Sequence, residues 1–153
     1  MNWNNLNDPI DIENFMDLFG GFHDSCLKEL YMWTETFVDE DLSMSMSVDL
    51  DTCVRVLFQR QESEPSAIEL LFKGVTHFHI HPREDGQDSI IYGAKLVLKE
   101  GLFYWAEDED WQIDQPFLHP VSWISAKEVH WRDASSWMGE EQRYGVLRDE
   151  ENL

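Results

Sequence analysis

The chain has 153 residues, of which 42% are hydrophobic and 13% aromatic, and its formal net charge is −20. This apolar content is too high for a disordered acidic chain, and the length fits a single domain, residues 1–153, with its own core. The negative charge disfavours binding to nucleic acid or to an anionic membrane, and it favours a basic protein partner. The alternative is that the acidity serves only to keep the protein in solution. We expect flexible ends at about residues 1–8 and 140–153.

The cellular compartment is inferred from the start of the chain and from its cysteines. The first residues, MNWNNLNDPIDIENF, contain no basic segment followed by an apolar stretch, and no later run approaches the roughly 18 apolar residues of a membrane helix. We therefore expect a cytoplasmic protein whose cysteines, Cys26 and Cys53, stay reduced.

The first half of the chain predicts one helix followed by strands. Apolar residues between 10 and 19 have helical spacing, and the glycine pair after them predicts the end of a short helix. Residues 22–37 are rich in aromatic side chains and predict a strand. The strictest alternation of apolar and polar residues lies at 42–50, which predicts a strand with one buried face, joined by a tight turn to a second strand at 53–61.

The second half predicts further strands at 67–80, 89–98, 102–106 and 121–131, with a bulge or bend at Gly74. Short turns join most of these strands, which is typical of antiparallel pairing. The predicted fold class is α+β, with a predominantly antiparallel curved sheet, barrel-like or sandwich-like, and one short N-terminal helix. An all-β fold is the alternative.

Three histidines recur at every second position, His77, His79 and His81, so their imidazoles would share one face of a strand. Neighbours on such a face lie about 6–7 Å apart, so two of the three plus one further ligand could bind a divalent metal. The candidates for that further ligand are His23, Asp24, His119 and His130. The alternative, which we favour, is a histidine-rich solvent face and no cofactor.

The stretch from Tyr104 to Trp111 combines aromatic rings with four consecutive carboxylates. Aromatic anchors beside carboxylates suit the capture of Lys and Arg side chains. We therefore predict a binding site for a basic partner, made of Tyr104, Trp105, Glu107, Asp108, Glu109, Asp110 and Trp111. The alternative is a solvated acidic turn beside buried tryptophans.

Residues 20–25 have the sequence GGFHDS. His23 lies close in sequence to Cys26 and could serve it as a base, but we favour a local role in which Asp24 and Ser25 bond to the backbone. This start, followed by an aromatic-rich sheet and acidic segments, resembles a group of small, uncharacterised bacterial proteins with an FHDS-like motif. Some of these look like immunity proteins of polymorphic toxin systems. The resemblance implies a non-enzymatic inhibitor that binds a toxin domain.

Common catalytic motifs are missing from the sequence, including a glycine-rich phosphate loop, GxSxG, CxxC and HExxH. We therefore assign no catalytic residue and do not favour an enzyme. The preferred hypothesis is an acidic cytoplasmic binding protein that inhibits or regulates a basic partner, for example an immunity-type inhibitor of a basic toxin. Two alternatives stay open: a metal-binding module or metal-dependent enzyme built on the histidine row, and a homo-oligomeric structural protein.

Overall fold

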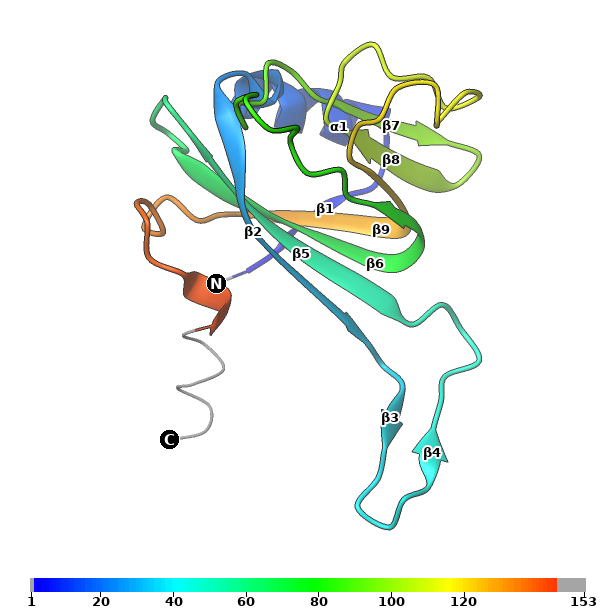
Figure 1. The fold of residues 1–153 in the computed structure, drawn as a ribbon. Coiled ribbons are helices and arrows are strands. Elements are labelled where there is room, and N and C mark those ends of the chain that lie inside the picture. Colours follow the sequence, from blue (N-terminus) through cyan, green and yellow to red (C-terminus); the bar gives the residue numbers. More distant parts are fainter. Residues whose placement is uncertain (1, 146–153) are drawn as a thin grey trace.

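The computed structural model describes residues 2–145 of the chain. It contains a short helix, α1 (Pro9–Leu18), and a 3-10 turn, η1 (Gly20–Phe22). Its strands are β1 (Asn4–Leu6), β2 (Ser25–Thr34), β3 (Phe37–Val38), β4 (Met44–Ser45), β5 (Thr52–Arg60), β6 (Ala67–His79), β7 (Lys95–Lys99), β8 (Leu102–Ala106) and β9 (Trp123–Asp133). The predicted mainly antiparallel sheet with one N-terminal helix is confirmed (Figure 1).

One antiparallel sheet of seven strands dominates the structure. Its order is β2-β5-β6-β9-β8-β7, and β1 pairs with the part of β9 that extends beyond β8. The sheet curves so far that its two ends meet at one point, where Ser25 at the start of β2 forms a bridge with Ile91, ahead of β7. Because this bridge is isolated, the sheet is not closed into a barrel.

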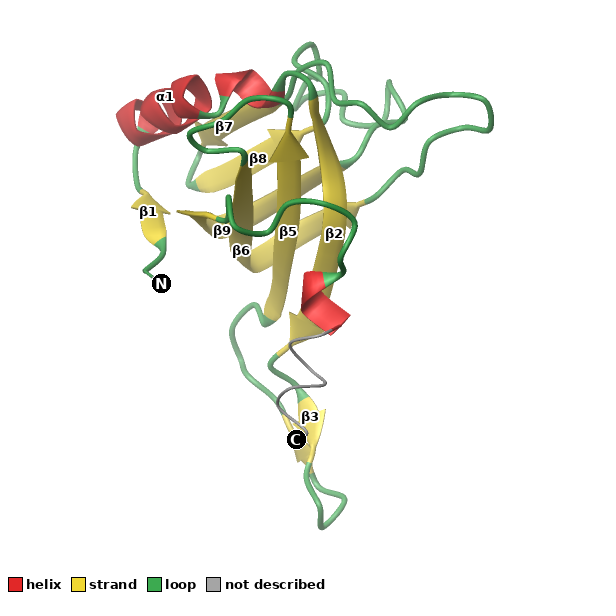
Figure 2. Ribbon diagram, turned by 90° about the vertical axis from the view of Figure 1, so that its left-hand side faces the viewer, coloured by secondary structure: helices red, strands yellow, loops and turns green. Residues whose placement is uncertain are grey.

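Helix α1 forms where the sequence supplies both of its end signals. The Asp8 carboxylate accepts a hydrogen bond from the Asp11 amide at 2.8 Å, and Pro9 occupies the first helical turn without needing a donor. The helix ends before Gly20 and Gly21, which adopt φ values of 59° and 62°, as predicted from the glycine pair. Ile12 and Phe15 face the sheet, so α1 covers part of one side of it (Figure 2).

The main core lies between α1, η1 and the inner face of the sheet. Phe22 is at its centre and makes edge-to-face contacts with Phe19, Phe58 and Trp105, at centroid distances of 5.0, 4.9 and 5.9 Å. Such aromatic pairs contribute about 0.5–1.5 kcal/mol each beyond their burial. Phe22 has φ at 65°, a conformation unfavourable for a residue with a Cβ, and these contacts offset that strain.

The strongest strand prediction, at 42–50, is wrong in its pairing and in its burial. Only Met44–Ser45 is a strand there, and it pairs with β3 rather than with residues 53–61. β5 pairs instead with β2 and β6. All five apolar side chains of the alternating pattern are exposed: Leu42, Met44, Met46, Val48 and Leu50. The pattern specifies two faces of an extended chain, but within residues 2–145 no other element covers these side chains, so they stay exposed.

Several other predicted boundaries change. Residues 4–6 are not flexible, since they pair with β9 and Leu6 is buried. The strand predicted at 89–98 is limited to β7, because residues 89–94 pair with the sheet only through the bridge at Ile91. Gly74 has φ at 62° beside a register shift between β6 and β9, which confirms the predicted bend. Among the described residues, no helix is long and apolar enough to cross a membrane.

Candidate functional site

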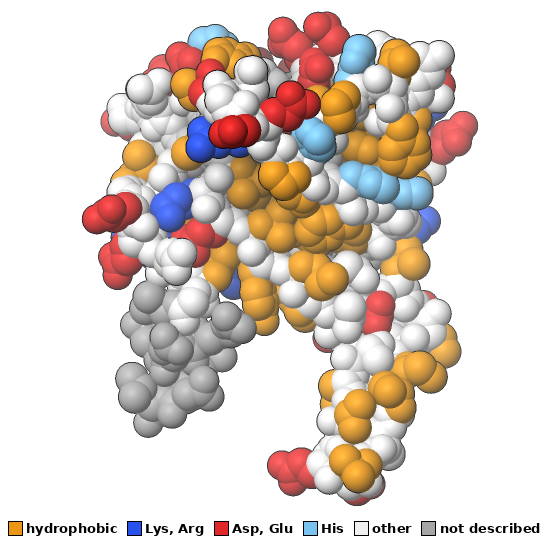
Figure 3. Space-filling model, viewed as in Figure 1, with side chains coloured by type: hydrophobic (Ala, Val, Ile, Leu, Met, Phe, Trp, Pro, Cys, Tyr) orange, Lys and Arg blue, Asp and Glu red, His pale blue; other side chains and the backbone are white. Residues whose placement is uncertain are grey.

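Residues 35–51, which we call the arm, project from the sheet as an extension of the β2–β5 hairpin (Figure 1). Seven of its large apolar side chains are exposed: Phe37, Val38, Leu42, Met44, Met46, Val48 and Leu50. Val48 is as exposed as in an extended peptide, at 103%. The space-filling view shows hydrophobic side chains along this protrusion (Figure 3). Exposed apolar surface concentrated in this way is typical of protein–protein or membrane interaction sites.

The charges of the arm all have the same sign. It contains Glu35, Asp39, Glu40, Asp41, Asp49 and Asp51, and no Lys or Arg. The hydroxyl and amide of Ser43 donate hydrogen bonds to Asp41 at 2.6 and 3.0 Å, and they hold the pKa of that carboxyl below its usual value. The arm therefore presents apolar side chains among ionised carboxylates.

Hydrogen bonds give the arm a defined shape. The Glu35 amide donates to the Asp51 carbonyl at 3.0 Å, and the Thr36 hydroxyl donates to the Asp51 carboxylate, which closes the base. At the tip, the Asp39 amide donates to the Ser43 carbonyl at 2.8 Å. A surface that is already ordered loses less conformational entropy when a partner binds.

The predicted acidic site near β8 is divided between the interior and the surface. Trp105 and Trp111 are buried, which corrects the expectation that their rings grip a partner. Trp105 belongs to the main core, and Trp111 packs on Trp123 at 5.0 Å. Tyr104 is half-buried beside Trp111. Of the four carboxylates, Glu109 and Asp110 are exposed, whereas Glu107 and Asp108 are half-buried.

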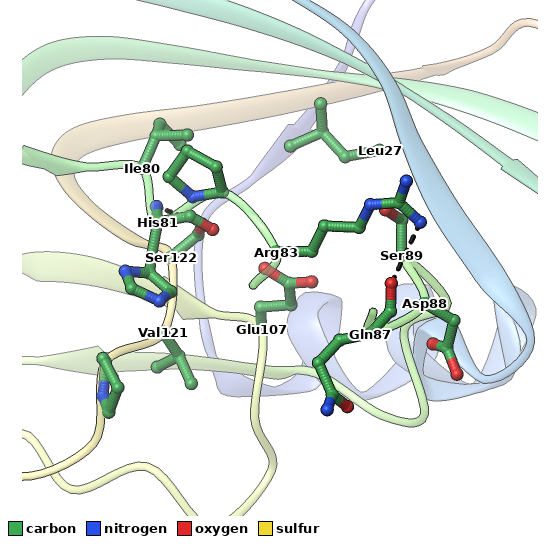
Figure 4. A pocket seen from close by; sticks show the side chains of 12 residues that line it. Leu27, Ile80, His81, Arg83, Gln87, Asp88, Ser89, Glu107, Val121 and Ser122 are labelled. Carbon is green, nitrogen blue, oxygen red and sulfur yellow. Dashed lines mark hydrogen bonds between the residues drawn. The ribbon is translucent and has the colours of Figure 1, made fainter. Parts of the chain in front are cut away.

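Glu107 lines a pocket of about 310 Å³ between the end of β6, the loop 80–89 and β2. The pocket also receives His81, Arg83 and Ser122, so it combines one residue of the predicted acidic site with one of the predicted metal row (Figure 4). Burial raises the pKa of the Glu107 carboxyl, and the opposing effects of a hydrogen bond to Ser122 and of nearby His81 are smaller.

The histidine row does not converge on one point. His77 and His79 stack on each other with centroids 5.8 Å apart, and both lie against the Trp123 ring, at 5.2 and 4.5 Å. His81 lies beyond the end of β6, and its amide donates to the Ser122 hydroxyl at 2.9 Å. Within residues 2–145, no group of three or more His, Cys, Asp or Glu side chains is arranged to hold a metal ion. The metal hypothesis therefore has no set of ligands here to support it.

His23 and Asp24 form a surface pair. The His23 Nδ1 atom lies 3.1 Å from the Asp24 carboxylate, and both side chains are at least half exposed. Ser25 next to them is buried and donates to the Phe22 carbonyl at 2.6 Å, which confirms its predicted bond to the local backbone. The motif therefore joins η1 to β2.

A buried ion cluster lies on the outer face of the sheet, and the sequence analysis missed it. Glu69 of β6 is fully buried and accepts hydrogen bonds from Arg55 at 2.7 Å, from Arg132 at 2.7 Å and from the Tyr144 hydroxyl at 2.8 Å. Burial, followed by the charge of Glu69, raises the pKa of Tyr144. The available signal was a glutamate within the apolar run AIELLF, since a buried charge needs partners.

The C-terminal segment 134–145 is fixed to the sheet by Tyr144 of this cluster and by two side chains outside it, Glu29 and Gln59. Glu29 of β2 accepts hydrogen bonds from the amides of Arg143 and Tyr144, at 2.8 and 3.3 Å. Gln59 of β5 donates to the Trp137 carbonyl at 2.9 Å. We expected residues 140–153 to be flexible, but Tyr144 is buried against the sheet. Residues 146–153 lie outside the described residues.

The apolar side chains of the arm stay exposed within the described part of the chain, and Glu107 forms no salt bridge there, although it has a hydrogen bond to Ser122. The Glu69 cluster, by contrast, is satisfied by its own partners. The arm and the Glu107 pocket are therefore the two candidate functional regions. In comparisons with known proteins, no family model, no curated protein and no solved structure matches the chain.

Proposed function

We propose that the protein binds a basic partner protein through the arm and thereby inhibits or regulates it. The observation that carries this proposal is the arm itself, an ordered projection whose apolar side chains are exposed and whose charges are all negative. The resemblance to immunity proteins makes inhibition of a basic toxin domain the specific form of the proposal.

Burial of apolar side chains supplies the attraction. A large apolar side chain contributes about 1.5–3 kcal/mol when it is fully removed from water. The arm exposes seven such side chains, so a partner that covers only some of them gains several kcal/mol before the cost of association is subtracted. The proposal thus needs no catalytic group on this chain.

Charge selects which partner covers the arm. Six carboxylates surround the apolar side chains, and the whole chain carries a formal charge of −20. A second copy would bring carboxylates against carboxylates, whereas a basic surface would be attracted and held. The same charges predict that association is faster at low salt and slower at high salt.

The experiment compares capture of proteins from a lysate of the source organism by three forms of the chain. The first is the wild type, and the second is an arm variant carrying Leu42→Ser, Met44→Ser, Met46→Ser and Val48→Ser. The third is a control carrying Ile10→Ser and Leu18→Ser, two exposed positions on α1. Because all six side chains are exposed, both variants should fold like the wild type.

We expect the wild type and the α1 control to capture the same proteins, identified by mass spectrometry, and the arm variant to lose them. Those proteins should be basic, and raising the salt from about 0.05 M to about 0.5 M should reduce their capture. Capture that is unchanged in the arm variant would contradict the proposal. So would arm-dependent capture of acidic proteins, or of a second copy of the chain alone.

A further inference from the structure

The Glu107 pocket contains an acidic group at its wall and apolar surface around it. Glu107 follows β8, and its amide donates to the Ser122 carbonyl at 2.9 Å, which fixes the backbone beside the pocket. Leu27, Ile80 and Val121 contribute apolar surface. This arrangement suits a ligand with an aliphatic stem that ends in a charge.

Glu107 forms no salt bridge with any Lys, Arg or His in the described part of the chain. The carboxyl is half-buried, and that burial raises its pKa because it penalises the charged form. A cation that entered the pocket would offset this penalty by pairing with the carboxylate.

The other charged groups of the pocket have partners of their own. Arg83 donates to the Gln87 carbonyl at 3.0 Å. Asp88 accepts hydrogen bonds from the Tyr92 hydroxyl and the Ile90 amide, at 2.7 and 3.0 Å. In Figure 4, Glu107 lies between the His81 and Arg83 side chains and is directed into the space they border. Glu107 has a hydrogen bond to Ser122 but no salt bridge among the described residues, so its carboxylate is the acidic group of the pocket that can still pair with a cation.

We propose that this pocket receives a Lys or Arg side chain of a protein partner, with the Glu107 carboxylate as its counter-ion. The inference rests on the proposed function, since it adds a second contact with the same basic partner. β2 lines the pocket at Leu27 and leads into the arm at Glu35, eight residues later. Eight extended residues span about 26 Å. A typical protein–protein interface, which buries about 800 Å² on each partner, is wide enough to include both the pocket and the base of the arm.

The test uses small probes that imitate single side chains. N-acetyl-arginine amide and N-acetyl-lysine amide are titrated into the full chain and followed by amide chemical shifts in NMR spectra. The uncharged N-acetyl-norleucine amide and the acidic N-acetyl-glutamate amide serve as controls. We expect the two cationic probes to give saturable shifts at the amides of His81 and Ser122, and the two controls to give none.

Substitutions separate Glu107 from the neighbouring charges. Glu107→Gln keeps the shape of the side chain, and it should weaken binding of the arginine probe about tenfold, which corresponds to the loss of one charge-assisted contact. Glu109→Gln, at an exposed carboxylate of the same stretch, and Arg83→Gln should not weaken it. Equal binding by Glu107→Gln, or tighter binding of the glutamate probe, would overturn the inference.

The pH dependence gives a second readout. Only the ionised carboxylate of Glu107 attracts a cation. Binding of the arginine probe should therefore fall as the pH drops through the raised pKa of Glu107, at a higher pH than that at which an exposed glutamate becomes protonated. His81, Arg83 and Asp88 also face the pocket, and protonation of His81 would act in the same direction. The arm variant should bind the probe like the wild type, so this test can fail while the arm still captures a partner.

Discussion

The hairpin of β2 and β5 has one part inside the sheet and another outside it, and the two parts differ in what covers them. Inside the sheet, Val54, Val56 and Phe58 alternate with outer-face residues and are fully buried by the core. Outside it, the apolar residues at 42–50 of the arm alternate just as strictly and remain exposed. An alternating pattern thus specifies which side chains share a face, but the surrounding structure decides whether that face is buried.

The largest expected effect concerns the outer face, where β5, β6 and β9 are covered by the segment 134–145. Glu69→Gln should lower the free energy of unfolding by about 3–5 kcal/mol, because Arg55 and Arg132 would lose the charge that compensates them. Urea unfolding measures this. Glu62→Gln is the matched control, since Glu62 is exposed and pairs with Arg60 only at 3.6 Å, and its effect should be about 0.5 kcal/mol or less. Equal effects of the two substitutions would refute a special role for the cluster.

Tyr144→Phe tests the same covered region through pH. Loss of the hydrogen bond to Glu69 should cost about 1.5–3 kcal/mol at neutral pH. The pKa of Tyr144 is raised in the folded chain, so the tyrosine's contribution is fully present below the pKa of an unfolded tyrosine, about 10, and is lost as the pH rises above it. The stability difference between wild type and variant should therefore shrink above about pH 10. A constant difference up to pH 11 or so would show that the hydroxyl does not couple to Glu69 in this way.

The stability effects of two valine-to-alanine substitutions, one in each part of the hairpin, compare the two parts directly. Val56→Ala in β5 should destabilise the chain by about 1.5 kcal/mol, because it removes two fully buried methyl groups. Val48→Ala in the arm should change stability by less than about 0.5 kcal/mol, since that side chain is already in water. Thermal and urea unfolding of both variants checks the prediction. A comparable loss from Val48→Ala would mean that the arm packs against the molecule.

The smallest expected effect is a gain in stability. The folded pKa of Glu107 is raised, so its contribution to stability is fully present below the unfolded pKa, about 4.3, and is lost as the pH rises through the folded value. Glu107→Gln should therefore be slightly more stable than the wild type at pH 7 or so, and the difference should vanish below about pH 4. Unfolding curves across this pH range test the prediction, and a loss of stability at neutral pH would show that the contacts with Ser122 and His81 outweigh the cost of burying the carboxylate.

Much of the fold was predictable because local signals agree with the tertiary structure. The Asp8 cap, Pro9 and the glycine pair bound α1 in the sequence as they do in the structure. The apolar strands β5 and β6 were found with nearly correct limits. The placement of β1 was not predictable, since three residues rich in asparagine carry no strand pattern, and their pairing with β9 depends on contacts distant in sequence.

The candidate site was only partly predictable. Glu107 was identified as a residue that could bind a basic group, but its pocket depends on the loop that brings His81 and Arg83 beside it. Trp105 and Trp111 were predicted either to anchor a partner or to be buried beside an acidic turn, because composition does not distinguish a buried ring from an exposed one. The structure has both rings buried. Residues 42–50 of the arm were predicted as a strand with one buried face, since the sequence does not reveal that these side chains stay exposed in the described structure.

Site-specific photocrosslinking tests the central claim most directly, because it reports what touches the arm. A photoreactive phenylalanine analogue is placed at Val48 in the arm or at Ile10 on α1, both of them exposed side chains, and the cells are irradiated. We expect adducts from position 48 with one or a few basic proteins, and none of these adducts from position 10. Adducts that form equally from both positions, or adducts from position 48 only with acidic proteins or a second copy of the chain, would contradict it.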